Sequence, residues 1–168
     1  MEDNDGIDAV SQRRTRIEQV LIRWSTATRR LGGESDTSSV LQWLSLEESS
    51  VLVQHWVVDV GAAKYGRLAL LPPSAGCVSG QLSPGYAPSW LVKKADSKFI
   101  IFNDYRTVGI ARCSWGFIRE NLAAMAAIDR NGYAVVSPEL TGVVTVDLEV
   151  DDDSFKYEVM AWGDLVAV

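Results

Sequence analysis

The feature that most constrains the fold of this chain is an alternation of apolar and polar residues close to its C-terminus. Between Val143 and Val150, valine or leucine occupies every even position, while Thr145, Asp147 and Glu149 occupy odd positions. A period of two places the two sets of side chains on opposite faces of a β-strand. The segment therefore predicts a strand with one apolar and one wet face, as in an antiparallel sheet.

The sequence DDDS at 151–154 then supplies a turn, and the chain returns with the same period. Phe155, Tyr157 and Val159 share the apolar face of the returning segment, which ends near Trp162. We therefore predict a β-hairpin over 143–162 that carries carboxylates on its wet face.

The N-terminal region predicts a long helix. Between Ile7 and Leu31, apolar residues recur at spacings of three, four and seven, which places them on one helical face. A pair of glycines follows and favours termination. We expect residues 1–6 to be a disordered tail and residues 7–168 to form a single α+β domain, because 168 residues is a usual size for one domain.

Other elements are predicted from local patterns. The valine-rich segment 51–60 favours a strand, because β-branched residues fit a pleated surface. We expect a short helix at 40–46 and a second long helix at 117–130, which an Asn-Gly pair terminates. The segment 72–89 is rich in proline and glycine and predicts a long loop.

Short apolar segments separated by brief turns predict further strands. We expect 90–92 and 99–102 to form a hairpin, followed by strands at 108–115 and 133–137. A doubly wound parallel sheet needs helices regularly between its strands, and the sequence does not supply them. The predicted fold is α+β, with a long N-terminal helix, a mainly antiparallel twisted sheet of about six to eight strands, and the helix near 117–130 packed on one face.

Charge is distributed unevenly along the chain. From Glu139 to Val168 there are eight carboxylates and one base, Lys156, whereas residues 61–120 hold eight bases and three acids. An asymmetry of this kind indicates an interaction surface more than it indicates a fold. The formal net charge of −6 disfavours direct binding to nucleic acid and to anionic membranes.

Targeting signals and cysteine usage suggest where the protein works. The N-terminus MEDNDGIDAV lacks the basic and then apolar pattern of a signal peptide. No apolar run approaches the roughly 20 residues of a membrane span. We expect Cys77 and Cys113 to be free buried thiols, because disulfides are rare in the cytosol. These observations predict a cytoplasmic protein.

We find no residue pattern that predicts catalysis, a metal site or a cofactor. His55 is the single histidine, and its place in an apolar segment favours a structural role over service as a base for Cys77 or Cys113. One histidine and two cysteines at these spacings do not suit zinc. The acidic run 151–153 lacks the EF-hand pattern for calcium, and 61–68 lacks the lysine and hydroxyl of a phosphate-binding loop.

The leading hypothesis is that this small acidic protein binds and neutralises a basic protein partner without being an enzyme. An acidic hairpin with aromatic residues suits fast and tight capture of a basic surface. Immunity proteins that neutralise bacterial nuclease toxins are similar in composition and size, although no motif links this chain to them. The residues predicted to bind the partner are Asp147, Glu149, Asp151, Asp152, Asp153 and Glu158, with Tyr157 and Trp162 as aromatic anchors.

Two other functions stay open on the sequence. The loop 76–90 would form a small-molecule or enzyme site if Tyr86 and Trp90 were its walls and Arg106 or Arg112 held an anion. A nucleic-acid accessory protein would instead use the arginines of the first helix, with the acidic hairpin as a mimic or a gate. The sequence does not decide the oligomeric state.

The main objection to the leading hypothesis is neutralisation within the molecule. If bases of the central segment paired with the acidic hairpin, little negative potential would be left for a partner. The bases concerned are Lys93, Lys94, Lys98, Arg106, Arg112 and Arg119.

Overall fold

The computed structural model describes residues 3–25, 41–57, 78–82, 87–128, 132–151 and 154–167. For residues 3–5, 7, 55–57, 148–151 and 154–155, the structure describes the backbone only. The elements, in chain order, are α1 (Asp3–Trp24), β1 (Gln42–Trp43), α3 (Leu46–Val57), β2 (Val78–Gln81), β3 (Ser97–Phe102), α4 (Tyr105–Val108), β4 (Ala111–Ser114), α5 (Trp115–Glu120), α6 (Leu122–Ala126), β5 (Tyr133–Val136), β6 (Gly142–Asp151) and β7 (Ser154–Gly163).

The strands form one antiparallel sheet of seven strands in the order β1-β4-β3-β5-β6-β7-β2. The predicted α+β class, the mainly antiparallel sheet and the long N-terminal helix are confirmed. The predicted hairpin is β6–β7, whose register runs from Gly142↔Gly163 to Asp151↔Ser154.

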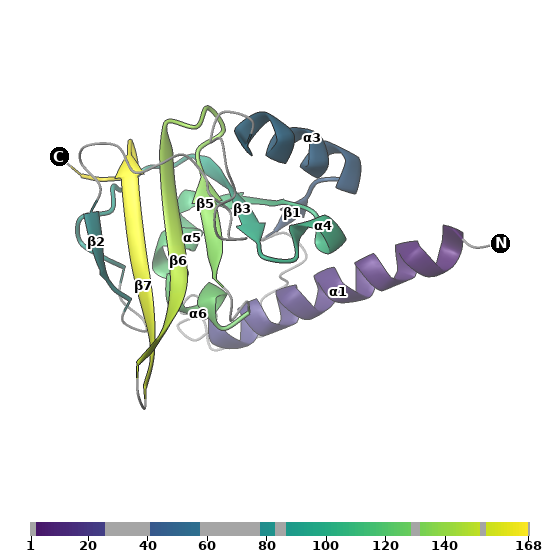
Figure 1. Ribbon diagram of the computed structural model, residues 1–168, viewed down its shortest axis with the longest axis horizontal. Helices are drawn as coiled ribbons and strands as arrows, with labels where there is room; N and C mark the ends of the chain where they lie inside the picture. The colour runs from purple at the N-terminus through teal and green to yellow at the C-terminus, as the bar shows by residue number, and fades with distance from the viewer. Residues whose placement is uncertain are drawn as a thin grey trace.

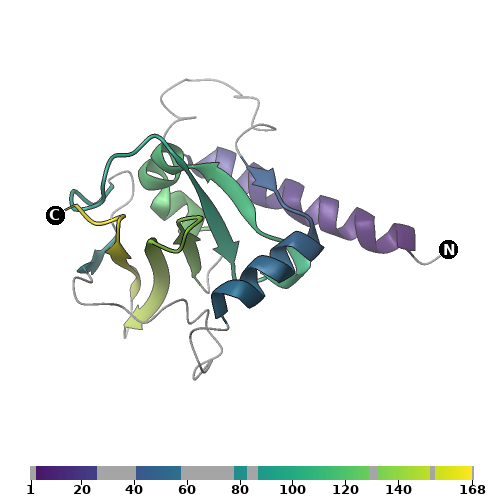
Figure 2. The same cartoon turned by 90° about the horizontal axis from the view of Figure 1, so that it is seen from above.

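Helices cover both faces of the sheet (Figures 1 and 2). On one face, α1, α5 and α6 pack on a first core that includes Ile17, Trp115 and Met125. On the other face, α3 places Val53 in a second core with Ile101 and other strand residues. All four residues of β5 are buried, because this central strand has cover on both sides.

The predicted strand at 51–60 is wrong, because Leu46–Val57 forms helix α3. Ser45 and Glu48 bond each other reciprocally: the Glu48 N–H donates to Ser45 Oγ at 3.1 Å, and the Ser45 N–H donates to Glu48 Oε2 at 2.9 Å. This capping box starts the helix and outweighs the strand preference of the valines. Residues 58–60 lie outside the described residues.

The short helix predicted at 40–46 is also wrong, because Gln42 and Trp43 form β1 and pair with β4. The N-terminal helix begins at Asp3, within the segment predicted as a tail, and its described part ends at Trp24. Residues 26–31, where the helix was expected to continue, lie outside the described residues.

The second helix predicted at 117–130 is two short helices, α5 and α6, separated at Asn121. Asn121 is buried, and its side-chain amide donates to the Phe117 carbonyl at 2.8 Å. A side chain that bonds its own backbone in this way competes with helix continuation. Residues 129 and 130 lie outside the described residues.

Two predictions about the central segment also change. Part of the loop predicted at 72–89 is the edge strand β2, which pairs with β7. The hairpin predicted between 90–92 and 99–102 does not form, because β3 pairs with β4 and β5, whereas Leu91 bridges Val166. Within the described part of the chain, no helix has the length and apolar character needed to cross a membrane.

Candidate functional site

The β6–β7 hairpin extends past its neighbours in the sheet. β5 pairs with β6 as far as Tyr133↔Val146, and the register does not continue further among the described residues. On the other side, β2 pairs with β7 as far as Gln81↔Glu158. Figure 1 shows the end of the hairpin projecting beyond the other strands. We call the segment 147–158 the acidic arm; its described residues are 147–151 of β6 and 154–158 of β7.

The acidic arm carries a large excess of negative charge. Residues 147–158 hold six carboxylates and one lysine, which gives a formal charge of −5. The register places Asp147 opposite Glu158 and Glu149 opposite Lys156. In general, like charges directly opposite each other in a sheet are unfavourable and opposite charges are favourable. Asp147, Lys156 and Glu158 each also interact within the molecule.

The two predicted aromatic anchors occupy different environments. Tyr157 is half-buried and packs against the first core. Trp162 is 6% exposed and belongs to the second core, beneath α3. Trp162 therefore offers a partner almost no surface in this structure. Asp152 and Asp153 lie outside the described residues, as do the side chains of Glu149 and Asp151.

Four of the six bases considered as neutralising groups contact residues away from the arm. Lys94 pairs with Asp164, which follows the end of β7 that is remote from the arm. Lys98 pairs with Asp96, and Arg119 donates to the Leu91 carbonyl. Arg106 contacts the neighbouring tyrosine, while Lys93 and Arg112 are exposed. Within the acidic block 139–168, Asp164 pairs with one of these bases, Lys94.

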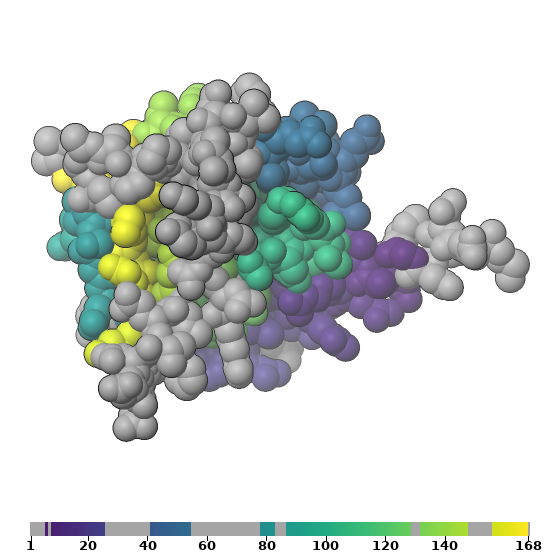
Figure 3. Space-filling model, viewed as in Figure 1, coloured from purple at the N-terminus to yellow at the C-terminus, as the bar shows by residue number. Residues whose placement is uncertain are grey.

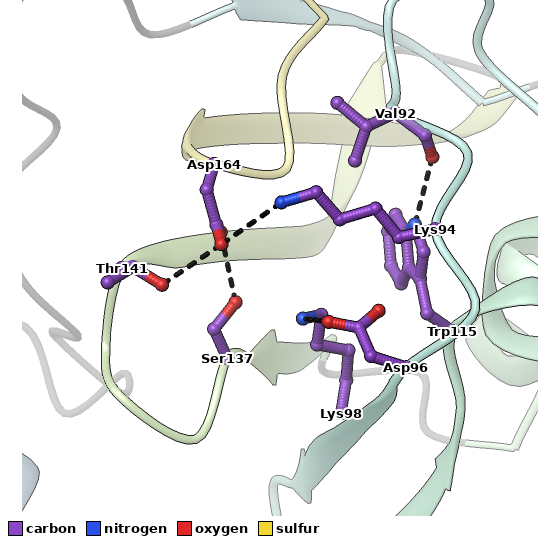
Figure 4. A network of polar contacts seen from close by, with 8 residues as sticks. All are labelled: Val92, Lys94, Asp96, Lys98, Trp115, Ser137, Thr141 and Asp164. Carbon is purple, nitrogen blue, oxygen red and sulfur yellow. Dashed lines mark hydrogen bonds and ion pairs between the residues drawn. The ribbon is translucent and has the colours of Figure 1, made fainter.

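Asp164 lies at the centre of a polar network at the end of the sheet opposite the arm (Figure 4). Its carboxylate accepts hydrogen bonds from Ser137 Oγ at 3.1 Å and Thr141 Oγ1 at 3.0 Å. It also forms an ion pair with Lys94 Nζ at 3.3 Å. Partial burial raises the pKa of Asp164, but these three donors lower it more, so the net pKa lies below its ordinary value. The network ties the turn between β5 and β6 to the C-terminal segment.

Lys98 belongs to the same region and is almost completely buried, at 2% exposure. Its ammonium group pairs with Asp96 at 2.5 Å, which gives the buried charge a partner. The nearby Trp115 Nε1–H donates to the Val92 carbonyl at 2.9 Å (Figure 4). Ser137 is fully buried, so its hydroxyl is not accessible to a substrate. The Thr141 hydroxyl is exposed and is bonded to the Asp164 carboxylate.

The cysteine and histidine considered for catalysis lie on opposite sides of the sheet. Cys113 is free and buried in the first core, and burial raises the pKa of its thiol to about 11. His55 belongs to α3, which packs on the other face. Cys77 lies outside the described residues. Among the described residues, no group of three or more His, Cys, Asp or Glu side chains is placed to hold a metal ion.

A groove that the sequence did not suggest lies between α1 and the start of α3. Its volume is about 470 Å³, and Trp43, Leu46 and Val10 form its apolar part. Arg14 stacks on the Trp43 ring at 5.2 Å and donates to the Leu44 and Val108 carbonyls, each at 2.7 Å. Figure 3 shows α1 running below α3 and α4 in this region.

The charged groups of this groove are already engaged. Glu18 accepts the Trp43 indole N–H at 2.8 Å and lies near Arg14. Burial lowers the pKa of Arg14 and the charge of Glu18 opposes that effect, so the guanidinium stays cationic. The two opposite charges leave the groove without a net sign that would select a charged ligand.

The alternative site proposed around the central loop is not assembled by the described residues. Trp90 lies against Gly80 of β2, at one edge of the sheet. Arg112 belongs to β4, five strands away, which is about 24 Å at the usual strand spacing. Arg106 lies on α4, which connects β3 to β4. Tyr86 lies outside the described residues.

Comparison with family models, with curated proteins and with solved structures gave no match to this chain.

Proposed function

We propose that this protein binds and neutralises a basic protein partner through the acidic arm, as toxin-immunity proteins do with nuclease toxins. The supporting observation is that a hairpin with a formal charge of −5 projects beyond the rest of the sheet. The role is stoichiometric capture and not catalysis.

Electrostatics explains why a projecting acidic hairpin suits this role. Charge placed on a protrusion is exposed to solvent on several sides, so it attracts an approaching basic surface before contact is made. Complementary potentials of this kind raise association rates and reject partners of like charge. The total charge of −6 adds to this effect. A toxin that acts on nucleic acid must itself be basic, which makes it a natural target.

The proposal depends on the net charge of the arm and not on any single unpaired carboxylate. Lys156 lies opposite Glu149, and other arm residues interact within the molecule. Six carboxylates still face one lysine, so most of the negative charge lacks a compensating cation within the arm. Lys94, Lys98 and Arg119 contact other groups, which weakens the case for neutralisation of the arm by these three bases.

The test compares two variants with the same change in net charge. The arm variant D147N/E149Q/D151N removes three carboxylates from β6, and the control E47Q/E120Q/E139Q removes three exposed carboxylates elsewhere. Tagged forms of wild type and both variants are used to capture proteins from the native lysate at low salt. We expect wild type and control to retain the same basic protein, and the arm variant to lose it.

Thermal unfolding of the three forms verifies that each one is folded before capture. If the arm variant retained the same basic protein as fully as the control, the arm would not be the binding surface. If the proteins retained by wild type were acidic, the partner class would be wrong.

A further inference from the structure

We infer that the protein forms a two-fold symmetric dimer in which the α1 helices of two copies pack antiparallel along their solvent-exposed faces. The inference does not depend on the proposed function, because the acidic arm takes no part in this contact. It assigns a partner to a helix face that is exposed in the single molecule.

The first observation is how little of α1 the rest of the molecule supports. Ile17 and Leu21 are buried in the first core, so one face of the second half of the helix is attached to the sheet. The first half extends beyond the other elements (Figures 1 and 2). A helical segment of about ten residues is marginal in water by itself. A second helix alongside it adds support.

A regular stripe of residues follows the exposed face of α1. Its members are spaced alternately four and three residues apart, which is the spacing that keeps residues on the seam between two packed helices. They are Asp5, Ala9, Gln12, Arg16, Gln19 and Arg23, and we call them the α1 stripe. The members from Ala9 onward are exposed, and the helical backbone places position 5 on the same face.

The α1 stripe matches itself when two copies run in opposite directions. A two-fold axis at the level of position 14 brings position 5 opposite position 23 of the second copy, position 9 opposite 19, and position 12 opposite 16. The resulting pairs are Asp5 with Arg23, Ala9 with Gln19, and Gln12 with Arg16. The first pair joins opposite charges, and the small alanine of the second leaves room for the glutamine.

The third pair is compatible with the contacts that Gln12 already makes. Its Nε2 donates to Asp8 at 2.8 Å, so its amide oxygen is turned to other donors. An amide oxygen accepts hydrogen bonds, and a guanidinium group only donates them. Arg16 of the second copy therefore meets an acceptor.

Charge along the whole of α1 is divided in the same sense. Residues 3–8 hold three carboxylates and no base, whereas residues 13–23 hold four arginines and one glutamate. Antiparallel packing places the acidic part of each helix beside the basic part of the other, whereas parallel packing places like charges together. Antiparallel helices also bring the positive end of one dipole to the negative end of the other. Charge therefore selects the antiparallel arrangement.

The arginines of α1 differ in their availability to a second copy. Arg13 pairs with Asp104 at 2.9 Å, and Arg14 donates to two backbone carbonyls. Arg16 and Arg23 are exposed, and among the described residues neither forms an ion pair. The two arginines that belong to the α1 stripe are therefore those that can bind outside the molecule.

The test measures self-association by sedimentation equilibrium over a range of protein concentrations at low salt. The variants are Asp5→Arg, Arg23→Asp and the double variant D5R/R23D, which exchanges the two charges. Lys93→Asp, at an exposed base outside α1, is the control for the change in net charge. Circular dichroism verifies that every form keeps its helix content.

We expect wild type and Lys93→Asp to dimerise with similar affinity, and each single α1 variant to dimerise about tenfold more weakly. Each pair occurs twice in a two-fold dimer, so one substitution turns two attractions into two repulsions. We expect the double variant to recover the affinity of wild type, because it restores opposite charges in both pairs.

These variants separate pairing from other effects of charge. Asp5→Arg changes the formal net charge from −6 to −4, so general repulsion between copies becomes weaker, whereas loss of the pair with Arg23 makes association weaker. Both single substitutions oppose the dipole of α1, and the double variant keeps both of these effects. Its recovery therefore reports the contact between copies and not the stability of the helix.

Wild type that stayed monomeric at all concentrations would overturn the inference, as would a double variant that associated no better than the single variants. Loss of the dimer in D147N/E149Q/D151N would also overturn it, because the basic part of α1 would then bind the acidic arm of a second copy. A monomer that retained nucleic acid through Arg16 and Arg23 would assign that face to nucleic acid and remove the dimer. None of these results bears on capture of a basic partner, which is measured separately.

Discussion

Asp164 is the residue whose contacts most clearly predict a pH effect. Three donors hold its carboxylate, and they lower its pKa more than partial burial raises it. A carboxyl whose pKa is lower in the folded state contributes stability that is fully present above its unfolded-state pKa. That stability is lost as the pH falls through the folded-state pKa, because protonation removes the charge that the donors stabilise.

We therefore expect Asp164→Asn to lower the free energy of unfolding by about 1 kcal/mol at pH 7 and by less in acid. The expected loss is small because the Asp164 side chain is 35% exposed, so water screens the pair with Lys94. Urea unfolding of wild type and variant at pH 7 and near pH 3 measures this. An equal difference at both pH values would show that the charge of Asp164 contributes nothing.

Gly163 is needed for its backbone conformation. Its φ of +76° lies in the left-handed region, and a Cβ atom there would collide with the Thr141 carbonyl oxygen. We expect Gly163→Ala to cost about 2 kcal/mol or more in unfolding free energy. The matched control is Gly116→Ala in α5, where a Cβ would meet nothing within 4 Å and where alanine favours the helix.

Chemical denaturation of the two glycine variants measures these costs. A Gly163 variant as stable as the Gly116 variant would show that the turn between β7 and the C-terminal segment relaxes easily.

At the scale of the element, helix α3 shows how a short polar signal overrides a longer apolar one. The sequence from Val51 onward has the composition of a strand, which led to a wrong prediction. The four residues from Ser45 to Glu48 carry the capping-box pattern, which was visible in the sequence and correctly marks the start of a helix. Burial of Val53 and Ser49 then fixes the helix on the sheet.

Removing the cap tests this account of α3. We expect Ser45→Ala to destabilise the protein by about 1 kcal/mol, because the Glu48 N–H loses its acceptor. The free energy of unfolding from urea titration measures the loss, with Ser50→Ala in the exposed middle of α3 as the control. If the two serine variants were equally stable, the cap would not be what stabilises the start of α3.

At the scale of the whole molecule, the error at α3 also explains the error at Trp162. The alternation over 143–162 correctly predicted the hairpin and which residues share a face, because a strict period of two has one structural solution. The second face was expected to be wet, but Val143 and Trp162 are buried there. It did not show what covers the second face. With 51–60 taken as a strand, nothing was expected above Trp162, whereas α3 lies over the second core to which that residue belongs.

Sheet order was the other feature that sequence patterns did not provide. Pairing of β3 with β5, and of β2 with β7, joins segments distant in the chain, and local periodicity carries no information on such contacts. The acidic residues of the arm were identified from the sequence alone, because charge is a property of composition. Their projection beyond the sheet became visible only in the fold (Figure 1).

The central claim is that the arm attracts a basic partner through its net charge. The most direct measurement is the association rate constant with the protein that wild type captures, determined over a range of salt concentrations for wild type, D147N/E149Q/D151N and E47Q/E120Q/E139Q. We predict a steep fall with salt for wild type and control, and a clearly shallower dependence for the arm variant, because salt screens exposed charges. The same salt dependence in all three forms would contradict the claim.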